Sequence, residues 1–205
     1  MPETPEEVYA RVTAAVGEDG RLPTPPVAEW DTFPWEAEAG ELRTRRLLPP
    51  VEAEEPRNGE GDTPCWRCQD EAGAHDIWRN ERWAVTSTKQ PTGLPLVVFL
   101  QSREHMDFHD MDDELASEFG RLTNTLHRIM HHLPNIGRVH IGKWGDGSQH
   151  LHVWFMARFE RIPQLRGSFA AEWDEILPPV PEDVWRADLH EVARKLATHD
   201  GTALV

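Results

Sequence analysis

The sequence predicts an α+β fold in which helices pack on an antiparallel sheet. Three observations lead to this prediction. Short strand-like segments follow one another after Cys65, one long amphipathic helix is expected over residues 112–133, and strands and helices do not alternate regularly. A regular alternation would instead favour a parallel sheet with crossover helices.

The organisation of the chain suggests one domain with an extension. A length of 205 residues suits a single domain of ordinary size with extra segments. We expect residues 1–64 to form an N-terminal extension with a short helix at 4–16, loops, and one or two strands within 35–48. Its last part, 49–64, is acidic and rich in proline, which is typical of a solvated connection. Residues 65–205 would form the main domain.

Charge and composition exclude several classes of function. The formal net charge of −15 argues against a stable nucleic-acid partner, because a phosphate backbone would be repelled. No apolar run approaches the ~18 residues of a membrane span, and the acidic N-terminus does not resemble a signal peptide. Two cysteines cannot form a disulfide framework for a chain of this length. We therefore expect a cytoplasmic protein without a membrane partner.

The elements of the main domain follow from hydrophobic periodicity. Strands are expected at 77–78 and 83–86, joined by a turn at Asn80, and then at 96–100, 138–142 and 150–159. In the helix over 112–133, apolar residues recur every three or four positions, and Asp112 or Asp113 would cap its start. A last amphipathic helix is expected over 181–198.

The predicted strand 150–159 carries polar side chains on one of its faces. Alternate residues of a strand share a face, so His150, His152, Trp154 and Met156 would point one way, while the apolar residues between them face the core. Buried imidazoles need hydrogen bonds or a metal ion. The plain alternative is that both histidines are satisfied polar residues on a half-exposed strand.

A zinc site is the second feature that the spacing indicates. Cys65 and Cys68 are separated by two residues, which lets both thiolates reach one ion, and zinc prefers four Cys and His ligands. His105 and His150 would complete the set if their strands are neighbours.

Three alternatives to this site remain open. The cysteines could be two free thiols, or a redox pair, although the βαβ context of such pairs is missing. Another histidine could replace His105 as a ligand. The candidates for this position are His109, His131, His132 and His140.

The order of the motifs resembles the histidine-triad superfamily, which includes nucleotide hydrolases and galactose-1-phosphate uridylyltransferases. The shared pieces are the pair Cys65-Trp-Arg-Cys68, an apolar strand after Pro91-Thr-Gly93, a basic residue and histidine ending at His105, a helix, and the run 147–154 containing His-Leu-His. The resemblance covers residues 65–158 and implies a HIT-like fold.

The resemblance also implies roles for particular residues. Cys65, Cys68, His105 and His150 would bind a structural zinc ion. His152 would be the nucleophile that attacks phosphorus and forms a covalent nucleotidyl-histidine intermediate. Three further residues would contact the substrate: Ser148, Gln149 and Trp154. The ligand would be a nucleotide or sugar nucleotide, the reaction hydrolysis or nucleotidyl transfer, and the assembly a homodimer.

Departures from the family pattern leave other functions open. Trp154 stands where the family has His or Gln, so the protein could instead bind nucleotides without turning them over. His140 occupies a position where asparagine is usual. In another register, Ser148, His150 and His152 would form the triad, but that register removes a zinc ligand. A third hypothesis is an interaction module in which residues 49–64 and the C-terminal region contact a partner.

Overall fold

A six-stranded antiparallel sheet forms the centre of the computed structural model, which describes residues 2–23, 33–70, 73–167 and 169–205. Within these residues the strand order is β6-β7-β5-β4-β3-β8. The strands are β3 (Asp76–Arg79), β4 (Trp83–Ser87), β5 (Leu96–Ser102), β6 (Ile136–Gly142), β7 (His152–Phe159) and β8 (Thr202–Ala203). The predicted α+β class is confirmed.

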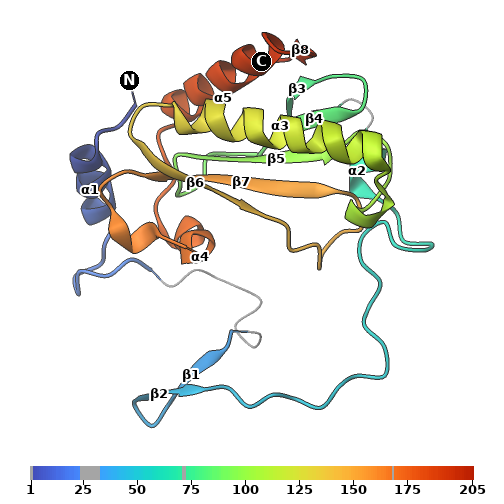
Figure 1. The fold of residues 1–205 in the computed structure, drawn as a ribbon. Helices are drawn as coiled ribbons and strands as arrows, with labels where there is room; N and C mark the ends of the chain where they lie inside the picture. Colours follow the sequence, from blue (N-terminus) through green and yellow to red (C-terminus); the bar gives the residue numbers. More distant parts are fainter. Residues whose placement is uncertain (1, 24–32, 71–72, 168) are drawn as a thin grey trace.

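Helices α3 (Asp113–His131) and α5 (Glu182–Ala197) cover one face of this sheet (Figure 1). The Asp112 side chain caps α3 by accepting a hydrogen bond from Leu115 N at 2.8 Å, as the sequence predicts. The apolar stripe of α3 buries Leu126, Ile129 and Met130 against the sheet. The opposite face of the sheet is therefore left for other contacts.

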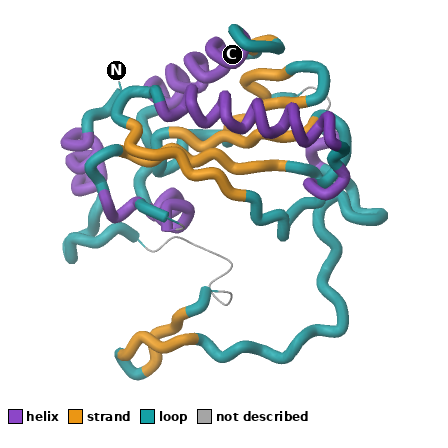
Figure 2. The backbone as a smooth tube through the Cα atoms, viewed as in Figure 1, coloured by secondary structure: helices purple, strands orange, loops and turns teal. Residues whose placement is uncertain are grey.

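The extension before residue 65 is partly packed and partly exposed. Helix α1 (Pro5–Ala14) starts at Thr4, which forms a capping box with Glu7, and buries Val8. The strands β1 (Trp35–Glu38) and β2 (Glu41–Thr44) form an exposed hairpin that projects from the body of the molecule (Figure 2). The predicted division at residue 64 stays a prediction.

Four features differ from the sequence-based expectation. The strand expected over 150–159 begins only at His152, so His150 lies before it. Helix α4 (Phe169–Ile176), which contacts β7 on the side away from α3 (Figure 1), was not predicted. Neither were the short strand β8 and the short helix α2 (Trp66–Gln69). No helix in the described ranges is long and apolar enough to cross a membrane.

Candidate functional site

The face of the sheet opposite α3 presents His152 and Trp154. Phe155 and Ala157 alternate with them and are fully buried in the core, as the period of two predicts. On the neighbouring strand β5, Gln101 pairs with His152 and Phe99 pairs with Trp154. The side chains of these four residues therefore share one face and lie next to each other.

Four predicted zinc ligands converge at one end of this face. The ligand atoms of Cys65, Cys68, His105 and His150 all lie within 4.8 Å of one another. Cys65 is the N-cap of α2 and Cys68 lies within α2, while His105 follows β5 and His150 lies two residues before the start of β7. Antiparallel pairing of β5 and β7 thus joins residues that are far apart in the sequence.

The spacing of these atoms fits tetrahedral zinc. Zn–S bonds of about 2.3 Å and Zn–N bonds of about 2.0–2.1 Å place sulfur and nitrogen about 3.6 Å apart in a tetrahedral site. The Cys65 Sγ and His150 Nδ1 atoms are 3.4 Å apart, and Cys68 Sγ lies 3.5 Å from Nδ1 of both His105 and His150. Partial desolvation and the neighbouring Cys65 raise the pKa of the free Cys68 thiol to about 11. Zinc binding would therefore have to displace a proton from that thiol.

His150 is held in one orientation by its second ring nitrogen. The side chain is 2% exposed, and Nε2 lies 2.9 Å from Ser102 O, to which it can donate while Nδ1 faces the cysteines. Burial lowers the pKa of His150, which favours the neutral imidazole that a metal ion requires. His150 therefore does not line the sheet face beside His152, contrary to the expectation from strand alternation. The turn before β7 directs it to the cysteines.

The His152 imidazole has one nitrogen engaged and one free. Nδ1 lies 2.8 Å from the backbone oxygen of His150, so Nδ1 carries the proton and donates it. Nε2 has no hydrogen-bond partner among the described residues. The carbonyl of His150 thus selects the tautomer in which the Nε2 lone pair of His152 is available for attack.

A pocket of about 700 Å³ opens beside His152. One wall comes from the face of β4 and β5, the other from α2 and the loops around it. The lining residues are Asn58, Trp66, Arg67, Asp70, Ala74, His75, Thr86, Ser87, Thr88, Lys89, Phe99, Gln101, Ser148, His150 and His152. The mixture of aromatic, hydroxyl and basic groups suits a small ligand that has a planar part and a phosphate.

A buried ion network fixes the loop that precedes β7. Asp107 accepts a hydrogen bond from Arg57 at 3.0 Å and pairs with Lys143 at 3.2 Å, and Arg57 also donates to Gly145 O. Burial raises the pKa of Asp107, but the Phe108 N–H, Lys143 and Arg57 outweigh this and lower it overall. The carboxylate stays charged and ties the 143–147 loop to the segment before α2.

The three predicted substrate residues have different surroundings. Ser148 lines the pocket, and its hydroxyl donates to Asn58 O at 3.3 Å. The backbone N–H of Gln149 donates to the same oxygen at 2.9 Å, so this N–H is not available to a phosphate in this conformation. Trp154 lies edge-on to Phe99 at 4.5 Å between ring centroids and contacts Trp144 at 5.8 Å. Their substrate roles stay predictions.

Several pocket residues were missed by the sequence reasoning. Asn58 joins the walls, because its side chain donates to Pro64 O and accepts from Trp66 N. Thr86 and Gln101 bond to each other on adjacent strands. The sequence could have indicated Thr86 and Gln101, because each is a polar residue within an otherwise apolar strand.

The alternative zinc ligands lie outside this cluster. His131 and His132 stand at the end of α3, and His109 is exposed beyond β5. His140 is on β6, opposite Met156. Within the part of the chain that the structure describes, the group of Cys65, Cys68, His105 and His150 is the one Cys/His/Asp/Glu cluster with metal-binding spacing.

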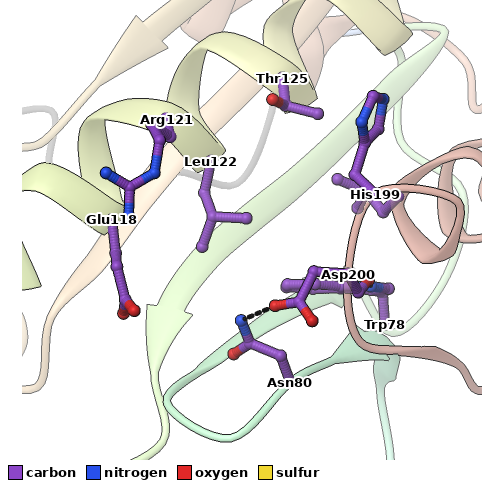
Figure 3. A pocket seen from close by; sticks show the side chains of 9 residues that line it. Trp78, Asn80, Glu118, Arg121, Leu122, Thr125, His199 and Asp200 are labelled. Carbon is purple, nitrogen blue, oxygen red and sulfur yellow. Dashed lines mark hydrogen bonds between the residues drawn. The ribbon is translucent and has the colours of Figure 1, made fainter.

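A second pocket lies on the helix-covered side of the sheet (Figure 3). It has a volume of about 290 Å³ between α3, the end of α5 and the turn after β3. An Asn80–Asp200 hydrogen bond of 2.7 Å closes one side of it. None of the predicted site residues lines this pocket.

Comparisons with known proteins give similarity in structure alone. No protein-family model matches the chain, and no curated protein matches it in sequence. Solved structures do resemble its fold. Those compared below are histidine triad proteins.

A hypothetical histidine triad nucleotide-binding protein from Sulfolobus tokodaii aligns with a TM-score of 0.48 and 12% identity, over 65% of this chain and 93% of that one. A histidine triad protein from Marinobacter aquaeolei aligns with a TM-score of 0.48 and 16% identity, over 62% of this chain and 91% of that one. A zinc-bound histidine triad family protein from Mycobacterium smegmatis aligns with a TM-score of 0.43 and 13% identity, over 62% of this chain and 88% of that one. These TM-scores stay below 0.5, so the likeness carries no conclusion about activity.

Proposed function

We propose that this protein is a nucleotidyl transferase or nucleotide hydrolase that acts through His152 and contains a structural zinc ion. The observation that carries the proposal is the hydrogen bond between His152 Nδ1 and His150 O, which leaves Nε2 free at the edge of the pocket. A neutral imidazole with a free lone pair is a competent nucleophile toward phosphorus. That the substrate is a nucleotide is inferred from the resemblance of the motifs to the histidine-triad superfamily.

Zinc would support this site without taking part in the chemistry. Its four ligands would be Cys65, Cys68, His105 and His150, which fill a tetrahedral shell and leave no position for substrate. The ion would fix His150, and the backbone carbonyl of His150 would in turn orient His152. This is support through position, similar to the outer-shell contacts that orient groups in other metal sites.

The pocket residues suggest how a nucleotide would bind. Trp66 is 74% exposed at the mouth, where an aromatic ring can stack on a base. Ser148 and the loop before it would contact the phosphate, close to His152. Lys89 supplies positive charge at the other end of the pocket, where it would meet further anionic groups.

Detection of the covalent intermediate tests the proposal. The full-length protein is incubated with ADP, UDP or UDP-glucose, quenched under alkaline conditions that preserve a phosphorus–nitrogen bond, and measured by intact mass spectrometry. We expect a mass increase of one nucleoside monophosphate residue, lost in His152→Ala and kept in His75→Ala, a histidine of the same pocket. An adduct that persists in His152→Ala would contradict the assignment.

A second candidate function is nucleotide binding without turnover. Trp154, at the position where the family offers a polar group, is the observation that favours it. It predicts that calorimetry detects binding of the same nucleotides to the wild type and to His152→Ala with similar affinity, while no adduct forms in either. Adduct formation in the wild type would exclude this candidate.

A further inference from the structure

Gln101 lies directly beside the proposed nucleophile, on the neighbouring strand of the sheet. It pairs with His152 across β5 and β7, and both residues line the same pocket. Residues directly opposite each other on one face of an antiparallel pair have Cβ atoms about 4.5–5.5 Å apart. The amide group of Gln101, two bonds beyond its Cβ, is therefore within reach of a group bound to Nε2 of His152.

A chain of hydrogen bonds orients the Gln101 amide. Arg67 pairs with both carboxylate oxygens of Asp76, at 2.9 and 3.1 Å, and the Asp76 side chain is 3% exposed. The Thr86 hydroxyl lies 3.0 Å from Asp76 Oδ1 and 3.2 Å from Gln101 Oε1. This hydroxyl has a single proton. Because Asp76 keeps its two partners on Arg67, the proton is available to Gln101 Oε1, which then faces β4.

The other half of the amide is left for a ligand. With Oε1 turned to Thr86, the two N–H groups of Gln101 Nε2 have no acceptor in the described part of the chain, and this nitrogen is not sealed inside the protein. It therefore opens to the pocket that Gln101 shares with His152. An amide does not titrate, so both N–H groups stay available as donors throughout the pH range of the folded protein.

Trp154, the next residue on the His152 face of β7, does not supply a comparable donor. Its ring packs against Phe99 and Trp144, with ring centroids 4.5 and 5.8 Å apart, and it does not line the pocket. Among the described strand residues that do line the pocket, Gln101 is the one with unengaged N–H groups next to His152.

From this arrangement we propose that Gln101 is a catalytic residue, an inference that rests on the proposed function. Its Nε2 donates a hydrogen bond to a non-bridging oxygen on the phosphorus atom that His152 attacks. Thr86 is the positioning residue that turns the amide so that its nitrogen, and not its oxygen, meets the phosphate.

The hydrogen bond acts in both steps of the reaction. First, the Nε2 lone pair of His152 forms a bond to phosphorus while the bridging P–O bond breaks, and the electron pair of that bond leaves on the departing phosphate. Water then attacks phosphorus, the P–N bond returns its electron pair to Nε2, and one water proton passes to solvent. In each step the non-bridging oxygens share negative charge, which a donor fixed beside them stabilises.

The rate of adduct formation tests the role of Gln101. Full-length wild type, Gln101→Ala and Gln101→Glu are mixed with ADP or UDP, and the intact mass is followed with time. Loss of one such donor lowers the rate by about 10²- to 10³-fold, so Gln101→Ala should react about 100-fold more slowly or worse. Gln101→Glu keeps the size of the side chain and an oxygen for Thr86 but has no donor, and should lose as much. Thr88→Ala, which removes a pocket hydroxyl outside this chain of bonds, should keep the wild-type rate.

Sulfur substitution identifies the atom that Gln101 contacts. In the Rp and Sp isomers of the α-thio analogue of the same diphosphate, sulfur replaces one or the other non-bridging oxygen and accepts hydrogen bonds weakly. The wild type should react about tenfold more slowly with one isomer than with the other, and Gln101→Ala should lose this difference. A residue that only supports the packing of the pocket would not change the response to sulfur.

Thr86→Val tests the orientation of the amide. The variant keeps the shape of the side chain but leaves Gln101 free to turn, so adduct formation should slow by about tenfold while the same thio isomer stays preferred. A wild-type rate in Thr86→Val would overturn the positioning role of Thr86.

The outcomes separate this inference from the proposed function. An adduct in the wild type, with a rate within tenfold of it in Gln101→Ala or an equal response to sulfur in both proteins, would overturn the role of Gln101 and leave the proposed function standing. Zinc content and thermal midpoint should match the wild type in all variants, and their loss in both Gln101 variants would assign Gln101 to the fold instead. No adduct in the wild type with either nucleotide would overturn both proposals.

Discussion

At the scale of single residues, Gly59 is placed so that only a hydrogen fits beside the zinc ligands. Its backbone has φ +82°, and a Cβ atom there would lie 2.9 Å from His105 Cε1 and 3.2 Å from Cys65 Cβ. The contact with His105 is closer than Cβ atoms approach other atoms in proteins, and the contact with Cys65 would require Cys65 to shift by a few tenths of an ångström. Both neighbours are ligand side chains that must keep their positions. The glycine thus permits the close approach of the 57–60 segment to the metal cluster.

Gly59→Ala should therefore weaken zinc binding. Displacing groups that orient metal ligands typically costs 10- to 100-fold in affinity, and we expect a loss in that range in a competition titration with a chromophoric chelator. The matched control is Gly61→Ala, because Gly61 also has a positive φ, +58°, but has open space around its Cβ position. Equal affinities of the two variants would contradict the steric argument.

At the scale of elements, α4 holds the turn that precedes β5. The Asp174 carboxylate accepts a hydrogen bond from the N–H of the buried Leu94 at 2.7 Å, and its backbone oxygen accepts from Gly93 N. Burial raises the pKa of Asp174, opposed by the bond from Leu94. This helix lies in the segment 159–180, for which the motif resemblance offers no counterpart.

Asp174→Ala should destabilise the fold, because the Leu94 N–H would be buried without an acceptor. Such a loss costs about 1–3 kcal/mol, which urea unfolding at neutral pH would measure. Asp174→Asn retains an acceptor and should lose less. Glu172→Ala, on the exposed side of the same helix, is the control and should change the free energy of unfolding by less than about 0.5 kcal/mol. A similar effect of both alanine variants would refute this role of α4.

The elements show what periodicity predicts and where it stops. Hydrophobic periodicity predicted α3, α5 and the central strands, because one face of each element packs on the core. It also predicted the burial of Val153, Phe155 and Ala157. It missed α4, although Ala170, Trp173 and Leu177 recur at helical spacing. It also extended β7 over His150, whose position is set by contacts with Ser102 and the cysteines and not by alternation.

Convergence of the site is a property of the tertiary fold. The spacing of Cys65 and Cys68 indicated a metal site, but the choice of His105 over the other histidines depended on the motif resemblance. In the structure that choice follows from the pairing of β5 with β7. The pocket wall from Asn58 was unpredictable for the same reason, since its contacts join separate segments.

At the scale of the whole molecule, one buried carboxyl group should make stability depend on pH. Asp188 on α5 is 6% exposed, and burial, with a smaller effect of Glu191, raises its pKa to about 6. The unfolded chain has a value near 3.9. Between these values the folded state binds more protons than the unfolded state, so this residue's contribution to stability falls as the pH rises through 6.

Asp188→Asn should remove this dependence, because the amide stays neutral. Relative to the wild type, the variant should gain stability as the pH rises from 4 to 6 and keep the gain above 6, up to about 3 kcal/mol. Urea unfolding across this range measures the difference. Asp183→Asn, on the exposed face of the same helix, should show no comparable growth in the gap. A constant difference in stability between wild type and Asp188→Asn would disprove the raised pKa of Asp188.

The homodimer implied by the resemblance stays a prediction.

Zinc content measured by elemental analysis tests the central claim most directly. Wild type, His150→Ala and His152→Ala are purified from zinc-containing medium, and metal per chain is measured together with the thermal midpoint. We predict about one zinc per chain in the wild type and in His152→Ala, and loss of both zinc and thermal stability in His150→Ala. That pattern would make His150 a ligand and leave His152 free for chemistry. A wild type without zinc, or equal loss of zinc in both variants, would contradict the account.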